Sequence, residues 1–404
     1  MKILVINSGS SSIKFRVYKT TKNGLEEIAR GIVERIGEEI SYFKYKSYKG
    51  EIRYDEVVLT HEEGFRHILK ALTDKDKGVI ESADEIVGVG HRVVHGGDKV
   101  WKPTVIDEDV EKVIGEYSRM APLHNPANLM GIRAAKKYFP KALHVAVFDT
   151  AFHSTLPDEA YLYAIPYEYY EKYKIRRYGF HGISHQYVSM KTAEILGQPL
   201  EKLRIITCHL GNGASLAAVK YGKSVETSMG LTPLEGLVMG TRCGDLDPSI
   251  MYFLVKWEGL SLDEVYDLLN KKSGVYGLSG MGNDMRIIEE EAMKGNERAI
   301  MTLKVYAHRV KKYIGAYMAI MGGVDVIVFT AGIGEKSPIM RKMILEDMDE
   351  LGIKIDEEKN NDPWRFNGVI STDDSKVKVL VIPTNEELMI ARETLKLYEA
   401  SKTR

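Results

Sequence analysis

The sequence predicts an α/β protein built from two domains. Its 404 residues are more than one ordinary hydrophobic core accommodates, so we expect two domains. Short apolar runs of strand type alternate with longer segments of helical periodicity, which is typical of sheets covered by helices. Several of these runs end in glycine followed by polar residues, as strands do when their ends line a binding cleft.

The first expected elements are two strands joined by a turn of small residues. KILVIN (2–7) is apolar, and in IKFRVYK (13–19) apolar residues (Ile13, Phe15, Val17) alternate with basic ones (Lys14, Arg16). The turn between them, NSGSSS, fits either a phosphate-binding loop or a plain hairpin turn. It is not a Walker loop, which needs a second glycine and a following helix. Small residues still let a backbone approach a phosphate, and Lys14 can supply charge.

The later elements follow the same pattern of strand, polar turn and helix. Strands are expected within 85–97, 142–153, 204–223 and 324–337, and helices over Asp107–Met120, Asn125–Tyr138 and around Met340–Leu351. The chain closes with a strand and a helix for which Thr384 or Asn385 is the N-cap, with Glu386 and Glu387 in its first turn.

Two segments share one local pattern. NSGSSSIKF and LGNGASLAA both place a turn of small residues between two apolar runs. The chain is therefore either an internal duplication or a protein with two unrelated hairpins.

Composition narrows the classes of partner. The formal net charge of −1 provides no field that would gather nucleic acid or anionic lipid, so neither partner is expected. The apolar stretch 314–334 contains Asp325 and the pair Gly322-Gly323, which predicts a helix end, a turn and a buried strand rather than a membrane span. Two cysteines and the lack of a signal-peptide apolar region predict the reducing cytoplasm.

Several polar residues stand out after the predicted strands. His91/His95 and His181/His185 have HxxxH spacing, but the intervening glutamate of a zinc motif is missing, so zinc is not favoured. Arg92 and Arg242 lie among glycines and are either solvated or clamp an anion. Asp149 is a turn cap or a catalytic carboxylate, and Glu386 a first-turn acid or a metal ligand. Their joint arrangement suits Mg²⁺-dependent phosphoryl transfer.

Eight motifs in order carry a family resemblance: NSGSSSIKF, HRVVHGG, FDTAFH, GFHGISH, HLGNGAS, GTRCGDLDP, FTAGIGE and PTNEE. Together they resemble the acetate kinase family of short-chain acyl kinases, within the sugar kinase, heat-shock protein and actin superfamily, from residue 2 to about residue 395. The resemblance implies two duplicated RNase H-like domains, as in actin-like ATPases, with an interdomain cleft. Residues 1–150 plus 385–404 would form the first domain, and 151–384 the second, nucleotide-binding one.

The resemblance also implies a role for each matching residue. The catalytic residues would be Arg92, Asp149, His181 and Arg242. The acyl substrate would be bound by Arg92, His124, Val94, Leu123, Phe180 and Pro233. The nucleotide would be bound by Lys14, Ser10, Ser12, His209, Leu210, Gly211, Asn212, Gly213, Asp284, Met285, Arg286, Gly332, Ile333, Gly334, Glu335 and Lys336. Asn7 and Glu386 would hold Mg²⁺, with Mn²⁺ as a substitute.

The implied activity is reversible transfer of the ATP γ-phosphoryl group to acetate, giving acetyl phosphate and ADP, in a cytoplasmic homodimer. A carboxylate with a pKa near ~4 is already ionised at neutral pH, so we expect Asp149 to orient an arginine or a metal-bound water rather than remove a proton. One alternative is a propionate or butyrate kinase. The other is an actin- or chaperone-like ATP switch without an acceptor, which Arg92 and the apolar pocket residues argue against.

Overall fold

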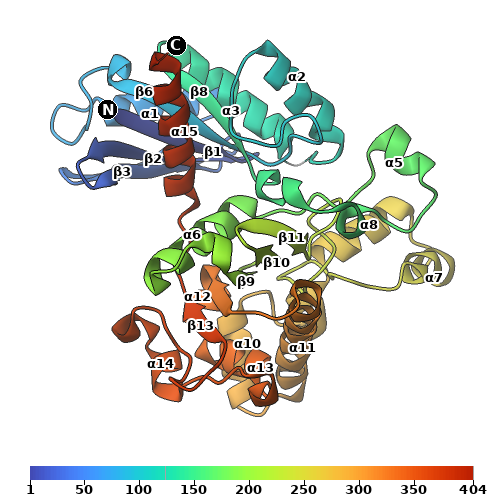
Figure 1. Ribbon diagram of the computed structural model, residues 1–404. Helices are drawn as coiled ribbons and strands as arrows, with labels where there is room; N and C mark the ends of the chain where they lie inside the picture. Colours follow the sequence, from blue (N-terminus) through green and yellow to red (C-terminus); the bar gives the residue numbers. More distant parts are fainter. Residues whose placement is uncertain (123, 404) are drawn as a thin grey trace. The chain divides into compact units, whose positions relative to one another are not determined.

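The computed structural model describes residues 1–122 and 124–403. The chain divides into two compact units (Figure 1), one formed by Met1–Ala151 with Asn385–Arg404 and the other by Phe152–Thr384. Among the described residues, no helix has the length and apolar character needed to cross a membrane.

The first unit contains one mixed sheet in the order β5-β4-β3-β2-β1-β6-β8-β7. Its strands are β1 (Lys2–Ser8), β2 (Ser12–Thr21), β3 (Gly24–Glu34), β4 (Ser41–Ser47), β5 (Gly50–Glu56), β6 (Ile86–Val93), β7 (Thr104–Val105) and β8 (Leu143–Phe148). Its helices are α1 (His61–Leu72), α2 (Glu108–Glu116), α3 (Asn125–Tyr138) and α15 (Glu386–Lys402). The strands from β5 to β1 are antiparallel, whereas β1, β6 and β8 run parallel.

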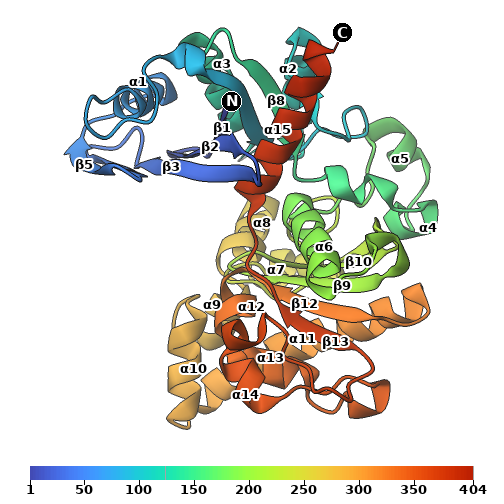
Figure 2. The same ribbon diagram turned by 60° about the vertical axis from the view of Figure 1, so that its left-hand side comes forward.

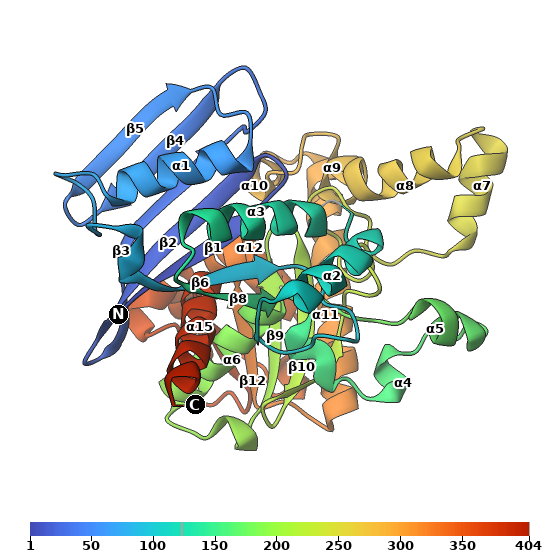
Figure 3. The same cartoon turned by 90° about the horizontal axis from the view of Figure 1, so that it is seen from above.

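Helices cover both faces of the central strands in this unit (Figure 3). On one face, α1 and α3 enclose a core that includes Phe15, Val89 and Phe65. On the other face α15 approaches closely, because β6 has glycine at positions 88 and 90. A methyl group on Gly90 would stand 2.3 Å from Thr394 Oγ1 of α15. The absence of a side chain there lets α15 lie directly on the sheet and fixes where its first residue, Glu386, is placed.

The second unit contains a five-stranded sheet in the order β11-β10-β9-β12-β13. Its strands are β9 (Arg204–Leu210), β10 (Ala214–Lys220), β11 (Lys223–Thr227), β12 (Val326–Thr330) and β13 (Lys378–Val381). Its helices are α4 (Asp158–Tyr161), α5 (Glu168–Tyr173), α6 (Gly182–Leu196), α7 (Ser249–Trp257), α8 (Leu262–Lys271), α9 (Gly274–Ser279), α10 (Met285–Met293), α11 (Glu297–Met321), α12 (Ala331–Lys336), α13 (Pro338–Leu345) and α14 (Glu357–Asn361). Helix α6 packs on one face of this sheet and the long helix α11 on the other (Figure 2).

Both units repeat one strand order. In each, three antiparallel strands (β3-β2-β1 and β11-β10-β9) continue into two parallel ones (β6-β8 and β12-β13). The sequence alone allowed the hairpins β1–β2 and β9–β10 to be either copies from an internal duplication or unrelated. In the structure they occupy the same place in the two sheets. The duplicated α/β architecture is therefore confirmed, with β4, β5 and β7 added to the first copy.

The expected elements are mostly where the sequence predicts them, with two differences. The helix expected over Asp107–Met120 ends at Glu116 and continues as a short 3₁₀ turn, Tyr117–Arg119. The helix expected around Met340–Leu351 begins earlier, at Pro338, with Ser337 as its N-cap, and ends at Leu345. The final helix is capped by Asn385, whose side chain accepts a hydrogen bond from the Leu388 amide.

Candidate active site

The turn between β1 and β2 carries the first group of predicted residues. Asn7 and Lys14 are direct partners across the two strands, so their side chains lie on the same face at the end of the hairpin. The turn closes through a 2.8 Å hydrogen bond from the Gly9 amide to the Ser12 carbonyl. Ser10 is exposed and Ser12 is partly exposed, so both hydroxyls can reach a ligand. This arrangement is a hairpin turn that also offers the donors of a phosphate site.

A basic groove of about 270 Å³ begins beside Lys14 on the same unit. Its charged lining consists of Lys14, Arg16, Arg30, Lys44, Lys46 and Arg53, with the carboxylates Glu51 and Glu387. The strand register aligns these residues in cross-strand rows, such as Lys14, Ile32, Lys44 and Arg53. A chain of net charge −1 thus presents locally positive surface next to the predicted phosphate loop.

Arg92 and Asp149 form an ion pair at the ends of two parallel strands. Arg92 lies on β6, and Asp149 follows β8 with its amide bonded to the Val93 carbonyl at 2.9 Å. Arg92 Nη2 donates to Asp149 Oδ2 at 3.1 Å, and the Asp149 side chain is only 2% exposed. Burial alone would lower the pKa of Arg92, but neighbouring carboxylates, first Asp149 and then Glu386, outweigh it and raise that pKa. The guanidinium therefore stays charged.

Glu386 is the first residue of α15, and the charges of Arg92 and Asp149 also act on its pKa. Its withdrawal from solvent raises its pKa to about 7, while Arg92 opposes this rise and the Asp149 carboxylate adds to it. Asn7, Asp149 and Glu386 thus provide oxygen donors within one unit. A divalent cation bound there would offset the repulsion between the Asp149 and Glu386 carboxylates. Oxygen donors of this kind suit Mg²⁺, which keeps waters and takes its other ligands from substrate phosphates.

In the first unit, the structure locates two further predicted substrate residues. Val94 is 5% exposed and its amide donates to Asn128 Oδ1 at 3.1 Å. His124 is exposed at the start of α3. The prediction for Leu123 falls outside the described residues.

In the second unit, His181, Arg242 and the turn at Gly213 converge. A methyl group on Gly213 would lie 2.8 Å from Arg242 Nη2 and 3.4 Å from the His181 ring. Arg242 Nη1 donates to the Pro233 carbonyl at 2.6 Å. Burial lowers the pKa of Arg242, with a smaller opposing contribution from the Tyr266 phenol. Within residues 1–122 and 124–403, no carboxylate lies within 4.0 Å of the Arg242 guanidinium, so its charge is available to an anion.

His181 is held in a backbone conformation that few residues adopt. It has φ 55° at the N-cap of α6, and such left-handed geometry away from glycine is concentrated at functional sites. Its ring stacks on His209 with centroids 4.1 Å apart. Its Nδ1 hydrogen-bonds Ser215 Oγ at 2.9 Å, and Ser215 Oγ also bonds His185 Nε2 at 2.8 Å. The two histidines therefore share Ser215 as a hydrogen-bond partner.

The nucleotide residues predicted in this unit lie at the end of β9 and in the turn that follows it, in α12 and at the start of α10. Thr330, the last residue of β12, pairs with His209 of β9, which brings the turn at 209–213 beside residues 332–336 of α12. Asp284–Arg286 lies at the start of α10, where Asn283 Nδ2 bonds Asn212 Oδ1 at 2.9 Å. Leu210 and Met285 are the exceptions: both side chains are buried, 0% and 5% exposed, so these two residues can offer a ligand only backbone atoms.

The apolar residues predicted in this unit are also placed. Phe180 is buried at 3% exposed, and its carbonyl bonds the His153 ring at 2.9 Å. Pro233 lies in the loop that carries Arg242 and meets that guanidinium through its carbonyl. Sequence reasoning missed Ser215 and His185, whose contact with His181 depends on the fold. The second histidine of GFHGISH was the available signal, but its HxxxH spacing was considered only for zinc, which the sequence does not favour.

Comparison with known proteins gives one consistent result. The Acetokinase family model matches residues 2–392. An acetate kinase of Thermotoga maritima is 59% identical over 401 residues, covering 99% of both chains. A crystal structure of Porphyromonas gingivalis acetate kinase superposes with a TM-score of 0.92 at 46% identity, covering 98% of this chain and 99% of that one. A propionate kinase from Francisella tularensis gives 0.90 at 42% identity, with the same coverage. The chain therefore belongs to the acetokinase family.

Proposed function

We propose that the protein is an acetate kinase, which transfers the γ-phosphoryl group of ATP reversibly to acetate. The observation that carries this proposal is Arg242, a buried guanidinium anchored by the Pro233 carbonyl and by no carboxylate among the described residues. Phosphoryl transfer disperses negative charge over the equatorial oxygens, and catalysis rests on positioning and on fixed positive charge. The full-length similarity to acetate kinases supports the same assignment.

The proposed reaction is a single in-line displacement. A carboxylate oxygen of acetate forms a bond to the γ-phosphorus while the bond from that phosphorus to the β,γ-bridging oxygen breaks, giving acetyl phosphate and ADP. Arg92 would bind the acetate carboxylate. Arg242 and His181 would donate to the transferring group, since both converge on the turn at Gly213.

Asp149 has an orienting role in this scheme. Acetate needs no general base, because its carboxylate is already ionised at neutral pH. The 3.1 Å bond from Arg92 to Asp149 fixes one edge of the guanidinium and aims the rest of it. Asp149 would therefore act through Arg92, and through the waters of a bound metal ion.

Asn7, Glu386 and Asp149 are the residues that would surround Mg²⁺. Their donor atoms are all oxygens, which suits this ion. Bound there with the nucleotide, Mg²⁺ would neutralise charge on the phosphates. Lys14 would add charge from the neighbouring strand, and the turn 209–213 would give backbone donors.

Propionate is the second candidate acceptor, because the chain is also 42% identical to a propionate kinase. Val94, Phe180 and Pro233 would bound the acyl methyl. One methylene changes binding by only ~1–3 kcal/mol, so acetate preference is a matter of degree. We further propose that the protein is cytoplasmic and forms a homodimer. Light scattering of the purified protein would test the dimer.

The experiment that tests the function uses hydroxylamine to trap acyl phosphate. The purified protein is incubated with Mg²⁺, ATP and acetate, propionate or butyrate. Acyl hydroxamate should form with all three acids in the order acetate, propionate, butyrate of falling kcat/KM. Tight ATP binding without hydroxamate from any acid would instead support a nucleotide-operated switch.

A further inference from the structure

The loop that carries Pro233 and Arg242 has no regular secondary structure of its own. It runs from the end of β11 at Thr227 to the start of α7 at Ser249. Because Arg242 is anchored on the Pro233 carbonyl, the position of its guanidinium depends on the path of this loop. What holds the loop therefore also determines where the proposed catalytic charge lies.

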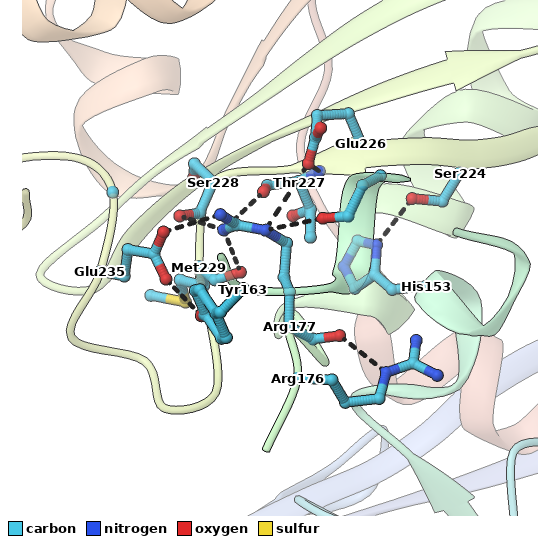
Figure 4. Close-up of polar contacts among 12 residues, drawn as sticks. His153, Tyr163, Arg176, Arg177, Ser224, Glu226, Thr227, Ser228, Met229 and Glu235 are labelled. Atoms are coloured by element: carbon cyan, nitrogen blue, oxygen red, sulfur yellow. Dashed lines mark hydrogen bonds and ion pairs between the residues drawn. The ribbon is translucent and has the colours of Figure 1, made fainter. Parts of the chain in front are cut away.

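Arg177, which precedes α6, holds the first part of this loop (Figure 4). Its Nη1 donates to three successive carbonyls, those of Thr227, Ser228 and Met229, at 3.1, 3.2 and 3.1 Å. Its Nη2 donates to Glu235 Oε1 at 2.7 Å. One side chain thus ties the start of the loop to a point only two residues beyond Pro233.

The Glu235 carboxylate is held from a second side. Tyr163 donates its hydroxyl hydrogen to Glu235 Oε2 at 2.5 Å and accepts one from the Leu231 amide at 2.9 Å. Gly230 is required for this approach, because a methyl group there would stand 1.8 Å from Glu235 Oε2. Arg177, Tyr163 and Glu235 therefore form one hydrogen-bonded cluster around the segment that contains Pro233.

The far end of the loop is fixed in a similar way. The Gly236 amide donates to Asp245 Oδ1 at 2.8 Å, and the Gly236 carbonyl accepts from Arg309 Nη1 at 2.9 Å. The Tyr313 hydroxyl donates to Asp245 Oδ2 at 2.8 Å. Gly236 has φ 108°, so glycine is needed at this bend.

Arginine is well suited to the centre of this cluster. The Arg177 side chain is 16% exposed. Burial alone would lower its pKa, but Glu235 and Tyr163 outweigh that effect and raise it. A planar guanidinium can serve several acceptors at once, whereas an ammonium group offers a single point of charge.

We infer that Arg177 is a positioning residue for phosphoryl transfer: through Glu235 and the carbonyls at 227–229 it fixes the loop on which Pro233 holds Arg242. The inference rests on the proposed acetate kinase function. Misplacing a catalytic group by about 1 Å costs ~100-fold in rate, so loss of this support is expected to act on the chemical step.

The first test compares Arg177→Met with Arg177→Lys, and uses Arg176→Gln as the matched control. The Arg176 guanidinium lies 3.7 Å from the Tyr161 ring centre, and its Nε bonds the Arg177 carbonyl rather than the loop. Arg177→Met should lower kcat about 10- to 100-fold, Arg177→Lys should restore part of it, and Arg176→Gln should leave it unchanged. Tyr163→Phe, which removes one bond to Glu235, should give a smaller, few-fold loss if Arg177→Met does not fold.

A second readout separates positioning from a loss of folded protein. Inhibition by ADP, aluminium fluoride and acetate, which together mimic the transition state, should weaken in Arg177→Met while ADP alone binds normally. A smaller folded fraction would change neither the inhibition constant of this mixture nor the dissociation constant of ADP. Equal inhibition of the variant and the parent protein would overturn the inference.

Amide hydrogen exchange tests the anchoring without any activity. Peptides covering 228–245 should exchange faster in Arg177→Met and near the parent rate in Arg176→Gln. Unchanged exchange in Arg177→Met would refute the inference even if the parent protein forms acyl phosphate. A parent protein that forms no acyl phosphate would refute the proposed function, and the exchange result would still decide whether Arg177 holds the loop.

Discussion

The pairing of Arg92 with Asp149 determines how these two residues can act. A carboxylate that is 2% exposed and bonded to a guanidinium at 3.1 Å is poorly placed to receive a proton from a substrate. It is well placed to keep that guanidinium charged and in one orientation. Two residues acting as one unit should show non-additive substitutions.

Asp149→Asn is therefore expected to lower kcat by about 100-fold through misorientation of Arg92. The loss should be the same fraction at every pH from about 6 to about 9, because no proton transfer is removed. Arg92→Gln should lower kcat to a similar extent, and the double variant should lose little more. Recovery of Asp149→Asn activity as the pH rises would contradict the orienting role.

Gly213 is constrained by the side chains of Arg242 and His181 and not by its backbone angles. Gly213→Ala places a methyl group 2.8 Å from Arg242 Nη2, so the guanidinium must move and kcat should fall at least 10-fold. The control is Gly315→Ala in α11, where nothing lies within 4 Å of the added carbon and helix propensity improves. Steady-state kinetics and thermal melting of both variants check this, and full activity in Gly213→Ala would contradict the convergence of Arg242 on this turn.

The residues that sequence reasoning found and those it missed differ in a physical way. Asn7, Asp149 and Arg242 stand beside glycines or strand ends, where polar residues need an explanation. Arg177 and Ser215 also lie two residues from a glycine, but that position alone does not indicate what they do. Their roles depend on partners 34 to 58 residues away, which only the packed sheets bring into contact.

At the scale of elements, many of the residues proposed to act in the reaction lie at or next to the ends of strands. The hairpins β1–β2 and β9–β10 each end in a turn of small residues, and β6, β8 and β12 each end beside such a turn or at a polar residue. The alternation of apolar and basic residues in β2 was predicted correctly: Ile13, Phe15 and Val17 are buried. Helix ends were harder to predict, because Ser337 caps α13 earlier than periodicity alone suggested.

The neighbouring strands β6 and β8 also contain a buried histidine pair that should make stability depend on pH. His91 Nε2 lies 3.0 Å from His144 Nδ1, and His144 Nε2 donates to the Phe139 carbonyl at 3.0 Å. Burial lowers the pKa of both rings, and Lys136 adds to the effect, with Glu111 opposing it at His144.

Both histidines are therefore neutral when folded and take up protons when unfolded. Because the unfolded state then binds more protons, the contribution of this pair to the free energy of unfolding should be constant above pH ~6.5 and fall as the pH drops below it. The slope should reach at most ~1.4 kcal/mol per pH unit for each histidine. Urea unfolding of the parent protein and of His91→Gln, which removes one titrating ring, measures this. An equal slope in both proteins below pH ~6.5 would contradict the assignment.

At the scale of the whole molecule, the duplication explains why one hairpin motif occurs twice. Repetition of the strand order shows that NSGSSSIKF and LGNGASLAA are equivalent turns in equivalent sheets. The sequence could suggest this from local pattern, but a choice between duplication and coincidence required the pairing of β9 with β12, more than 100 residues apart. In one copy the turn precedes Lys14, and in the other it meets Arg242 and His181.

In the proposed reaction, the γ-phosphoryl group passes directly from ATP to the carboxylate of acetate. The most direct measurement is the stereochemical course at phosphorus, using ATP whose γ-phosphoryl group is chiral through oxygen isotopes and acetate as acceptor. A single in-line displacement predicts inversion of configuration in acetyl phosphate. Retention would require an even number of displacements through a phosphorylated enzyme, and would contradict this account.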